Sequence, residues 1–213
     1  MRSTRFLEFP RSAGVAALAA LAAGVLSASA FAHAAVQPVP DCPSQTLVRP
    51  FLPWHDQSSY YLAPGGAFET TPAGWTLTGG AGVVSGNEPY DVNAAGDANS
   101  LSLPTGSSAT SPQMCVTIHS PNIRLFSANA GSRWSTLNVS VNYTDKRGLA
   151  RTMIVGALRA GSSWSLSPQI VFVNRIAPVV GAHSQTWVSF TFRPTSGGAW
   201  RIDDFYVDPL KSQ

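Results

Sequence analysis

Charged residues are scarce in this chain of 213 residues, and their scarcity excludes several classes of protein. Asp, Glu, Lys and Arg together make up 12% of the sequence, half the share of about 25% in an ordinary soluble domain. A disordered chain would have more charge and fewer aromatic residues, and a helical bundle would be rich in Glu, Lys and Leu. The formal net charge of +3 is too small to predict a nucleic-acid-binding surface. A β-rich, weakly charged domain remains.

Long apolar runs are also absent, except at the N-terminus. Three arginines among the first eleven residues precede an uncharged stretch from Ala13 to Ala32, rich in Ala and Leu, and residues 32–34 form an A-x-A pattern. This is the layout of a secretory signal peptide. We therefore expect residues 1–34 to be removed, although residues 28–30 offer a second cleavage pattern and the run is long enough for an uncleaved membrane anchor. The mature protein should be secreted, monomeric and without a membrane span.

Cysteine is limited to two residues, Cys42 and Cys115. They are too few and too far apart in sequence for a zinc site. In an exported protein an even pair favours a disulfide over two free thiols. A bridge that closes a loop of this length would stabilise the fold by about 4 kcal/mol in chain-entropy arithmetic. We expect it to anchor the N-terminal part of the mature chain.

Catalytic motifs are missing as well. The sequence has no G-x-S-x-G elbow and no H-E-x-x-H pair, and its histidines at 55, 119 and 183 are scattered. A glycosidase would need two carboxylates across a cleft. Glu88 and Asp91 are close in sequence, but they lie in a turn-rich segment, which favours a solvated loop. We therefore expect a protein without enzymatic activity.

Residues 35–64 form a Pro-rich N-terminal arm. Proline lacks a backbone donor and fixes φ, so this arm should form neither a regular helix nor an interior strand. It also contains Phe51, Trp54 and Tyr60, which is more apolar area than a flexible linker carries. The arm should therefore be an ordered segment that packs against the domain. Its prolines are Pro38, Pro40, Pro43, Pro50, Pro53 and Pro64.

Residues 65–213 read as a series of short strands separated by turn residues. Strands at this spacing of about 8–12 residues indicate a sandwich or a barrel. The expected strands are Ala67–Thr70, Gly74–Thr78, Ala81–Val84, Ser100–Leu103, Gln113–His119, Ile123–Ser127, Thr136–Asp145, Ala150–Leu158, Pro168–Val173, Gln185–Arg193 and Ala199–Val207. No convincing helix is visible.

Two of these strands alternate apolar and polar residues most clearly. In 136–144, Leu137, Val139 and Val141 share one parity, and the intervening residues are polar. In 185–193, Val188 and Phe190 alternate with polar residues in the same way. Such strands have one dry and one wet face. They predict an all-β fold, an antiparallel β-sandwich with a face open to water.

The two ends of this region carry a resemblance. The segment Gly65-Gly66-Ala67-Phe68-Glu69, followed by Gly74-Trp75, and the closing segment Ile202-Asp203-Asp204-Phe205-Tyr206-Val207 resemble galactose-binding-like jelly rolls, a group that includes many carbohydrate-binding modules. The chain as a whole also resembles small exported actinobacterial proteins.

The resemblance implies a jelly roll whose first and last strands lie close together. It also implies a structural Ca²⁺ held by Glu69 and by Asp203 or Asp204. This sequence has Pro64 where the family usually has Asn before the opening glycine, and the remaining carboxylate ligand is not placed.

The wet strand faces offer candidate ligand contacts, because sugar recognition uses flat aromatic faces beside fixed polar groups. Trp134, Asn138 and Asn142 share one parity, as do Trp187 and Arg193. If the two strands belong to one sheet, these side chains form one binding face for a polysaccharide or a cell-wall glycan. Alternatively, the indoles are covered by loops or by the arm, and the domain is a structural or protein-interaction module of the cell exterior.

Overall fold

The computed structural model describes residues 42–117, 122–176, 185–195 and 197–208. The expected signal peptide lies outside these residues, as do His119 and His183. Among the described helices, none combines the length and the apolar character needed to cross a bilayer.

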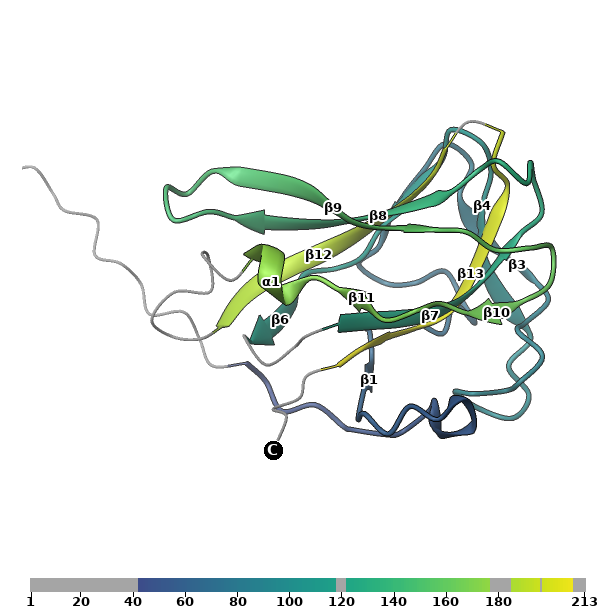
Figure 1. Ribbon diagram of the computed structural model, residues 1–213, viewed down its shortest axis with the longest axis horizontal. Coiled ribbons are helices and arrows are strands. Elements are labelled where there is room, and N and C mark those ends of the chain that lie inside the picture. The colour runs from purple at the N-terminus through teal and green to yellow at the C-terminus, as the bar shows by residue number, and fades with distance from the viewer. Residues whose placement is uncertain (1–41, 118–121, 177–184, 196, 209–213) are drawn as a thin grey trace, which may run out of the picture. The chain divides into compact units, whose positions relative to one another are not determined.

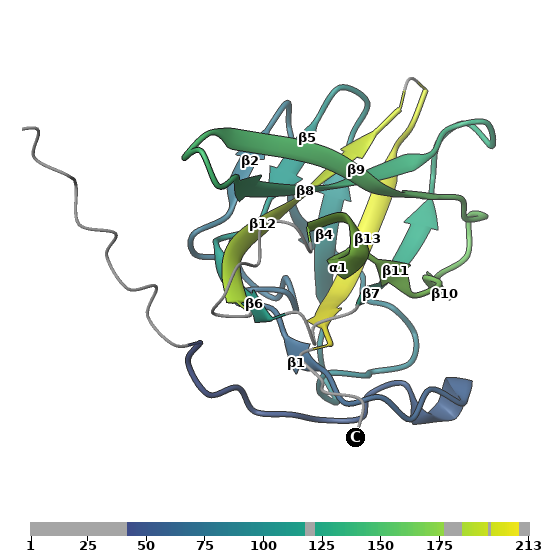
Figure 2. The same cartoon turned by 60° about the vertical axis from the view of Figure 1, so that its left-hand side comes forward.

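The described strands form two antiparallel sheets that pack face to face (Figures 1 and 2). This arrangement confirms the predicted antiparallel β-sandwich. The seven-stranded sheet has the order β10 (Ser165–Leu166), β7 (Asn122–Asn129), β13 (Trp200–Val207), β4 (Asn99–Leu103) and β3 (Gly82–Ser85), with β1 (Tyr61–Leu62) beside β13 and β11 (Ile170–Val171) beside β7. The six-stranded sheet has the order β2 (Thr76–Thr78), β5 (Ser108–Thr110), β12 (Gln185–Pro194), β8 (Leu137–Thr144) and β9 (Ala150–Leu158), with β6 (Met114–Thr117) beside β12.

The core lies between the two sheets, where the strand alternation places it. Val139 and Val141 of β8 and Phe190 of β12 are fully buried, because every second side chain of a strand points to the same face. They join Ile202 and Phe205 of β13 in one apolar cluster.

Two of the expected strands differ from the structure beyond a shift of their bounds. Ala67–Thr70 is not a strand, since Phe68 has a left-handed backbone with a φ of 52°, which turns the chain. Within 168–173 only Ile170–Val171 is a strand, and the chain then forms one helical turn, α1 (Val173–Ile176). The structure also contains β5, which sequence reasoning missed because Ser-Ala-Thr is too short to show a period.

Residues 42–64 of the N-terminal arm are ordered and pack on the outer face of the seven-stranded sheet around Phe126 and Tyr206. The arm carries one short 3₁₀ helix, η1 (Leu52–Trp54), and runs past β1 at the lower side of Figure 1. Phe51 and Tyr60 of the arm are fully buried against Phe126 of β7 and Tyr206 of β13. The described arm residues belong to the same compact unit as the sandwich.

A buried ion pair fixes the arm to β7. The Arg124 guanidinium lies 2.7 Å from the Asp56 carboxylate, and both side chains are nearly buried. Asp56 also accepts a hydrogen bond from the Tyr60 hydroxyl. Burial alone would raise the pKa of Asp56, but these hydrogen bonds outweigh it and lower the pKa to about 2. The arm is therefore held by a satisfied polar network beneath an aromatic cluster.

The predicted disulfide between Cys42 and Cys115 is confirmed, with the two Cα atoms 5.3 Å apart. Cys115 belongs to β6 of the six-stranded sheet. The arm thus starts on one sheet, at the bridge, and continues across the outer face of the other.

The opening and closing motifs meet at the turn between β1 and Phe68. Phe205 of β13 donates its N–H to the Gly66 carbonyl, and its own carbonyl accepts from Ala63. A Cβ on Gly66 would lie 2.8 Å from the Phe205 carbonyl oxygen, so only glycine fits there.

Candidate functional site

The outer face of the six-stranded sheet is polar over β8 and β12, and over β9 it also carries Ile154, which is 58% exposed and lies opposite Ser140. The register places Asn138 opposite Arg193 and Asn142 opposite Ser189. These residues share a face because Leu137, Val139 and Val141, which alternate with them, point into the core. Strands β8 and β12, which carry the candidate binding face, are therefore neighbours in one sheet.

Asn142 lies at the centre of this face and is held in place by its neighbours. Its amide nitrogen donates to the Thr191 hydroxyl at 2.9 Å, and its amide oxygen accepts from the Thr152 hydroxyl at 2.8 Å. The hydroxyl of Thr110 on β5 continues the network to Thr191. Hydroxyl and amide groups thus cross four neighbouring strands, in an arrangement suited to hydrogen-bonding a polar ligand.

The two candidate tryptophans lie at opposite ends of the face. Trp134 precedes β8 and is 74% exposed, so neither a loop nor the arm covers it. Trp187 lies at the other end, near the β8–β9 hairpin tip, and is half-buried. Strand β8, with eight residues, separates them by roughly 25 Å at about 3.3 Å per residue. The indoles are therefore two separate contact points, not a single aromatic platform.

A hollow of about 350 Å³ adjoins Trp187. Its walls combine the indole with the Thr144, Asp145 and Lys146 side of the hairpin tip and with Gln113. At the other end of the face, the Arg133 guanidinium carbon lies 4.7 Å from the centroid of a Trp134 ring.

Two further hollows lie beside the arm, on the opposite side of the sandwich. One, of about 600 Å³, lies between the arm, β1 and Tyr206. The other, of about 530 Å³, is bounded by Pro50, Pro53, Trp54, Tyr90 and Val92. Both hollows lie beside the arm residues that pack on the seven-stranded sheet. There the Trp54 ring already packs on the rings of Tyr90 and Phe126.

The expected metal residues lie at the end of the sandwich where the opening and closing motifs meet. Glu69 accepts backbone N–H groups of Ala98 and Asn99 at 2.9 and 3.1 Å. Asp203 accepts the N–H groups of Glu88 and Asp204. All these carboxylate oxygens already have partners on the backbone.

Asp204 differs from its neighbours. One of its carboxylate oxygens accepts the Asn93 N–H at 3.2 Å, whereas the other is buried without a hydrogen-bond partner. Burial raises the pKa of Asp203 to about 8, and the Asp204 charge adds to the shift. Burial and the charges of Glu88, Asp97 and Glu69 raise the pKa of Asp204 to about 7. Of the two candidate aspartates, Asp204 is thus the one whose charge interacts with Glu69.

Glu88 was expected to be solvated, and this expectation is wrong. It is 1% exposed, and its carboxylate accepts the N–H groups of Tyr90 and Val92 at 2.6 and 2.8 Å. The Asn-Glu-Pro sequence signals a turn but not its burial, which results from packing against β13. Within the described residues, no group of three or more His, Cys, Asp or Glu side chains is arranged to hold a metal ion.

Comparison with known proteins gives a fold but no family. No protein-family model matches the chain, and no curated protein matches it. Among solved structures, the chain is similar to the CBM22-1 and GH10 modules of an endo-1,4-β-D-xylanase from Clostridium thermocellum, solved with xylohexaose. The TM-score is 0.51 at 12% identity, over 68% of this chain and 28% of that chain.

A second similar structure is the CBM22-1 xylan-binding domain of Xyn10C from Paenibacillus barcinonensis, with a TM-score of 0.46 and 18% identity over 70% of this chain and 94% of that one. The fold is thus a jelly roll of the type found in carbohydrate-binding modules. The chain spans little more than a quarter of the C. thermocellum structure.

Proposed function

We propose that this protein is a secreted, non-catalytic carbohydrate-binding module whose glycan lies across the outer face of the six-stranded sheet. The observation that carries the proposal is the open polar face itself. Its hydroxyl and amide network is fixed before any ligand arrives, and exposed indole surface lies at both of its ends. Xylan and xylohexaose, named for the two similar structures, support the ligand class.

The absence of catalysis is part of the proposal. Asp203 and Asp204 have raised pKa values, which often marks a catalytic acid. However, they are 0% and 2% exposed, so a polysaccharide cannot reach them. The alternative, a structural or protein-interaction domain of the cell exterior, would leave the open face without a small ligand.

Affinity gel electrophoresis across a panel of soluble polysaccharides tests the function. We expect retardation by at least one polymer, and loss of that retardation in Trp187→Ala. Tyr90→Ala is the matched control, because Tyr90 is 48% exposed on the opposite side of the sandwich. Loss of binding in the control but not in Trp187→Ala would place the site beside the arm instead. Absence of binding to every polymer would favour the structural role.

Secretion is proposed from the leader and from the disulfide, which is typical of oxidising compartments. Expression in a host with a general secretion pathway should release a protein that begins at Ala35. Intact-mass analysis of the secreted and cell-bound fractions checks this, and a cell-bound product that retains residue 1 would contradict it.

Calcium binding is proposed from the buried carboxylates around Asp204. Asp204 would provide its unpartnered oxygen, Glu69 a second carboxylate, and backbone carbonyls the remaining ligands, since Ca²⁺ takes six to eight oxygens. A bound ion would also relieve the repulsion among the buried carboxylates. We expect Ca²⁺ to raise the melting temperature and EDTA to lower it again. Asp204→Asn should remove this response, and Asp91→Asn, at an exposed position of the 86–98 loop beside β13, should keep it.

A further inference from the structure

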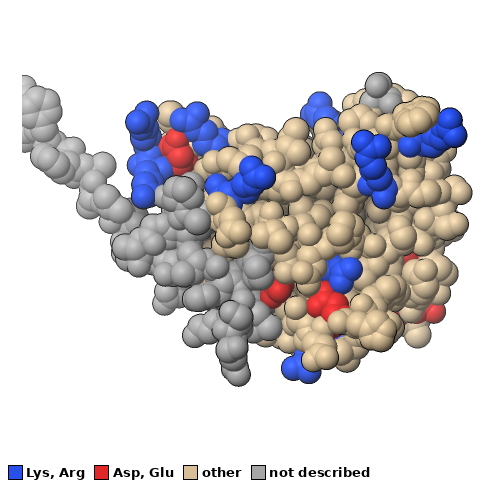
Figure 3. Space-filling view, viewed as in Figure 1, with Lys and Arg blue, Asp and Glu red and all other residues tan. Residues whose placement is uncertain are grey.

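Acidic residues are distributed unequally between the strands of the two sheets, whereas each sheet has two arginines in its strands, Arg124 and Arg201 in the seven-stranded one. The strands of the six-stranded sheet contain no Asp or Glu, and they contain Arg151 and Arg193. In the other sheet, β13 carries Asp203 and Asp204, and the loop beside it contains further acids. In Figure 3 the Lys and Arg atoms lie mainly along the upper side, over β8 and β9, and the acidic atoms lie lower, apart from those at the hairpin tip.

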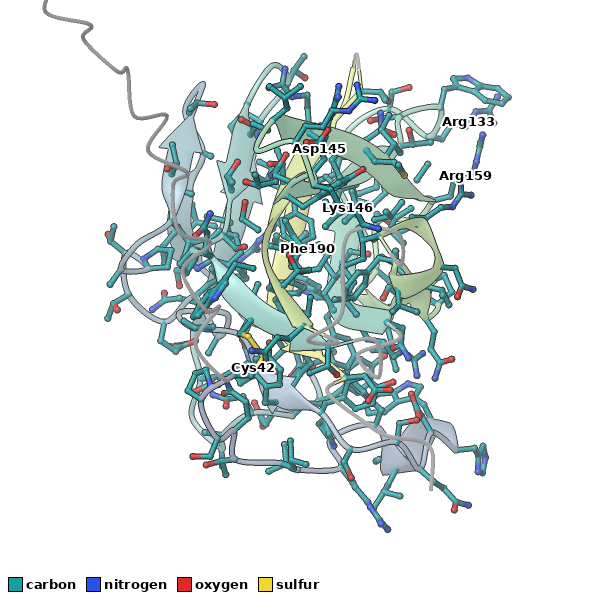
Figure 4. All side chains as sticks on the ribbon, turned by 90° about the vertical axis from the view of Figure 1, so that its left-hand side faces the viewer. Cys42, Arg133, Asp145, Lys146, Arg159 and Phe190 are labelled. Carbon is teal, nitrogen blue, oxygen red and sulfur yellow. A yellow bond between two sulfur atoms is a disulfide. The ribbon has the colours of Figure 1, made fainter. Side chains whose placement is uncertain are left out.

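Basic residues also border the open face at both ends. Lys146 and Arg147 form the tip of the β8–β9 hairpin, and Arg133 and Arg159 flank the start of β8 and the end of β9. Arg133 and Arg159 point outward from the body in Figure 4. All four of these side chains are exposed, as is that of Arg193.

The acid at the border of this face is already neutralised. The Asp145 carboxylate accepts the Arg151 guanidinium at 2.8 Å and the backbone N–H groups of Arg147 and Leu149. The described residues contain two ion pairs, this one and the pair of Arg124 with Asp56. Five cations around the face therefore lack a carboxylate partner among these residues. They are Arg133, Lys146, Arg147, Arg159 and Arg193.

Each candidate indole has one of these cations beside it. Lys146 and Trp187 line the same hollow at the hairpin end, and Arg133 lies over Trp134 at the other end. An indole presents a flat apolar surface to a sugar ring, while an ammonium or guanidinium group binds a carboxylate, sulfate or phosphate. The pairing repeats at both ends, so a ligand with regularly spaced anionic groups would satisfy it.

We propose that the glycan bound by this face is anionic, with carboxylate, sulfate or phosphate groups on its sugar units. This inference rests on the proposed carbohydrate-binding function and specifies the class of its ligand. The polar network of Asn142 serves the hydroxyl groups of such a polymer, and the unpaired cations serve its charges. A neutral xylan would use the network and leave the five cations without a role.

The test compares polymers that differ only in charge. Polygalacturonate and its fully methyl-esterified form share one backbone, so the difference in affinity between them isolates the anion. We expect the acid form to bind about tenfold or more tightly at low salt, which corresponds to about 1.4 kcal/mol. The difference should shrink as NaCl rises from about 0.05 M to about 0.5 M, since added salt screens exposed charges. A sulfated galactan and a phosphate-bearing teichoic polymer, tested in parallel, distinguish the sources of the charge.

Variants locate the effect on the molecule. Lys146→Glu and Arg193→Glu should each weaken binding of the preferred anionic polymer by about tenfold. Arg49→Glu is the matched control, since Arg49 is an exposed arginine of the arm, and it should bind like the unmodified protein. An unchanged melting temperature verifies that each variant is folded.

Four outcomes would overturn the inference. If the neutral and acidic polymers bind equally, the ligand is not selected by charge, and the carbohydrate-binding function still stands. If Arg49→Glu weakens binding as much as Lys146→Glu, the attraction belongs to the whole molecule and not to this face. If double-stranded DNA binds as tightly as the best polymer, and Trp187→Ala has no effect, the surface is a general polyanion binder. Absence of binding to any polymer refutes the function together with the inference.

Discussion

The outer faces of the two sheets differ in what covers them. The seven-stranded sheet is buried on both sides along β7, where seven of the eight residues are buried. In the six-stranded sheet, β8 alternates buried and half-buried residues, because its outer face meets solvent. Strand β7 is thus packed between the core on one face and the arm on the other. The six-stranded sheet keeps one surface free, and the proposed binding site lies on it.

The arm explains why only one sheet is covered. It provides aromatic rings that pack edge-on, with the Phe51 centroid 4.9 Å from Tyr60 and 5.4 Å from Tyr206. The Arg124 guanidinium lies over the Phe51 ring as well. Nothing of this kind lies over Asn142 and Thr191 within the described residues. We therefore expect changes under the arm to affect mainly stability and changes on the open face to affect mainly binding. Four changes test this contrast.

The largest effect should come from removing the disulfide. Replacing both Cys42 and Cys115 by serine frees a loop of 73 residues and should reduce the free energy of unfolding by about 4 kcal/mol. Chemical denaturation measures the loss. Cys115 lies opposite Trp187 in the strand register, so affinity is measured on the folded fraction to separate a loss of stability from a loss of binding. A loss below about 1 kcal/mol would show that packing alone holds the arm in place.

The next effect should come from breaking the buried ion pair under the arm. Arg124→Met leaves the Asp56 carboxylate buried without its cation, which costs about 3–5 kcal/mol. Arg151→Met is the matched control, because the Arg151 side chain is 48% exposed and such surface pairs contribute about 1 kcal/mol or less. Equal losses in the two variants would contradict the contrast between the faces.

Acid should weaken the arm in a defined pH range. The folded-state pKa of Asp56 is lowered to about 2 from its ordinary value of 3.8. Its ionised form therefore stabilises the fold fully above about pH 4, and this contribution, about 2 kcal/mol, is lost as the pH falls towards 2. Unfolding measured across this range checks the slope. Asp56→Asn should be less stable at neutral pH and should show a flatter acid profile.

The smallest effect on stability should come from the open face. Trp134→Ala removes a side chain that is 74% exposed, so the free energy of unfolding should change by no more than about 0.5 kcal/mol. Affinity for the glycan should fall nonetheless, if the indole contacts it. A large loss of stability would mean that Trp134 packs against something in the folded protein.

Local patterns predicted the parts of this fold that depend on a residue and its near neighbours. The alternation in 136–144 and 185–193 gave strands β8 and β12 with the correct buried faces, since a strand's side chains alternate whatever lies beside it. The even pair of cysteines gave the disulfide. The short β5 and the left-handed Phe68 were missed because neither leaves a periodic signal.

Both the local sequence pattern and the long-range strand order determine the candidate site. Parity alone placed Asn138 and Asn142 on one side of β8, and placed Trp187 and Arg193 together on β12. That these strands are neighbours is a matter of strand order, which the sequence does not reveal, because pairing joins residues far apart in the chain. The burial of Glu88 and Asp204 likewise follows from packing of the 86–98 loop against β13.

The sequence by itself determined the β class, the disulfide and the polar parity of the two central strands, because each follows from composition or from local periodicity. Only the tertiary structure decided which sheet the arm covers and which sheet stays open. It also decided that the two indoles lie at opposite ends of one face, each beside a cation. These are consequences of long-range packing, in which apolar area such as that of Phe51 is buried on whichever surface the connected chain can reach.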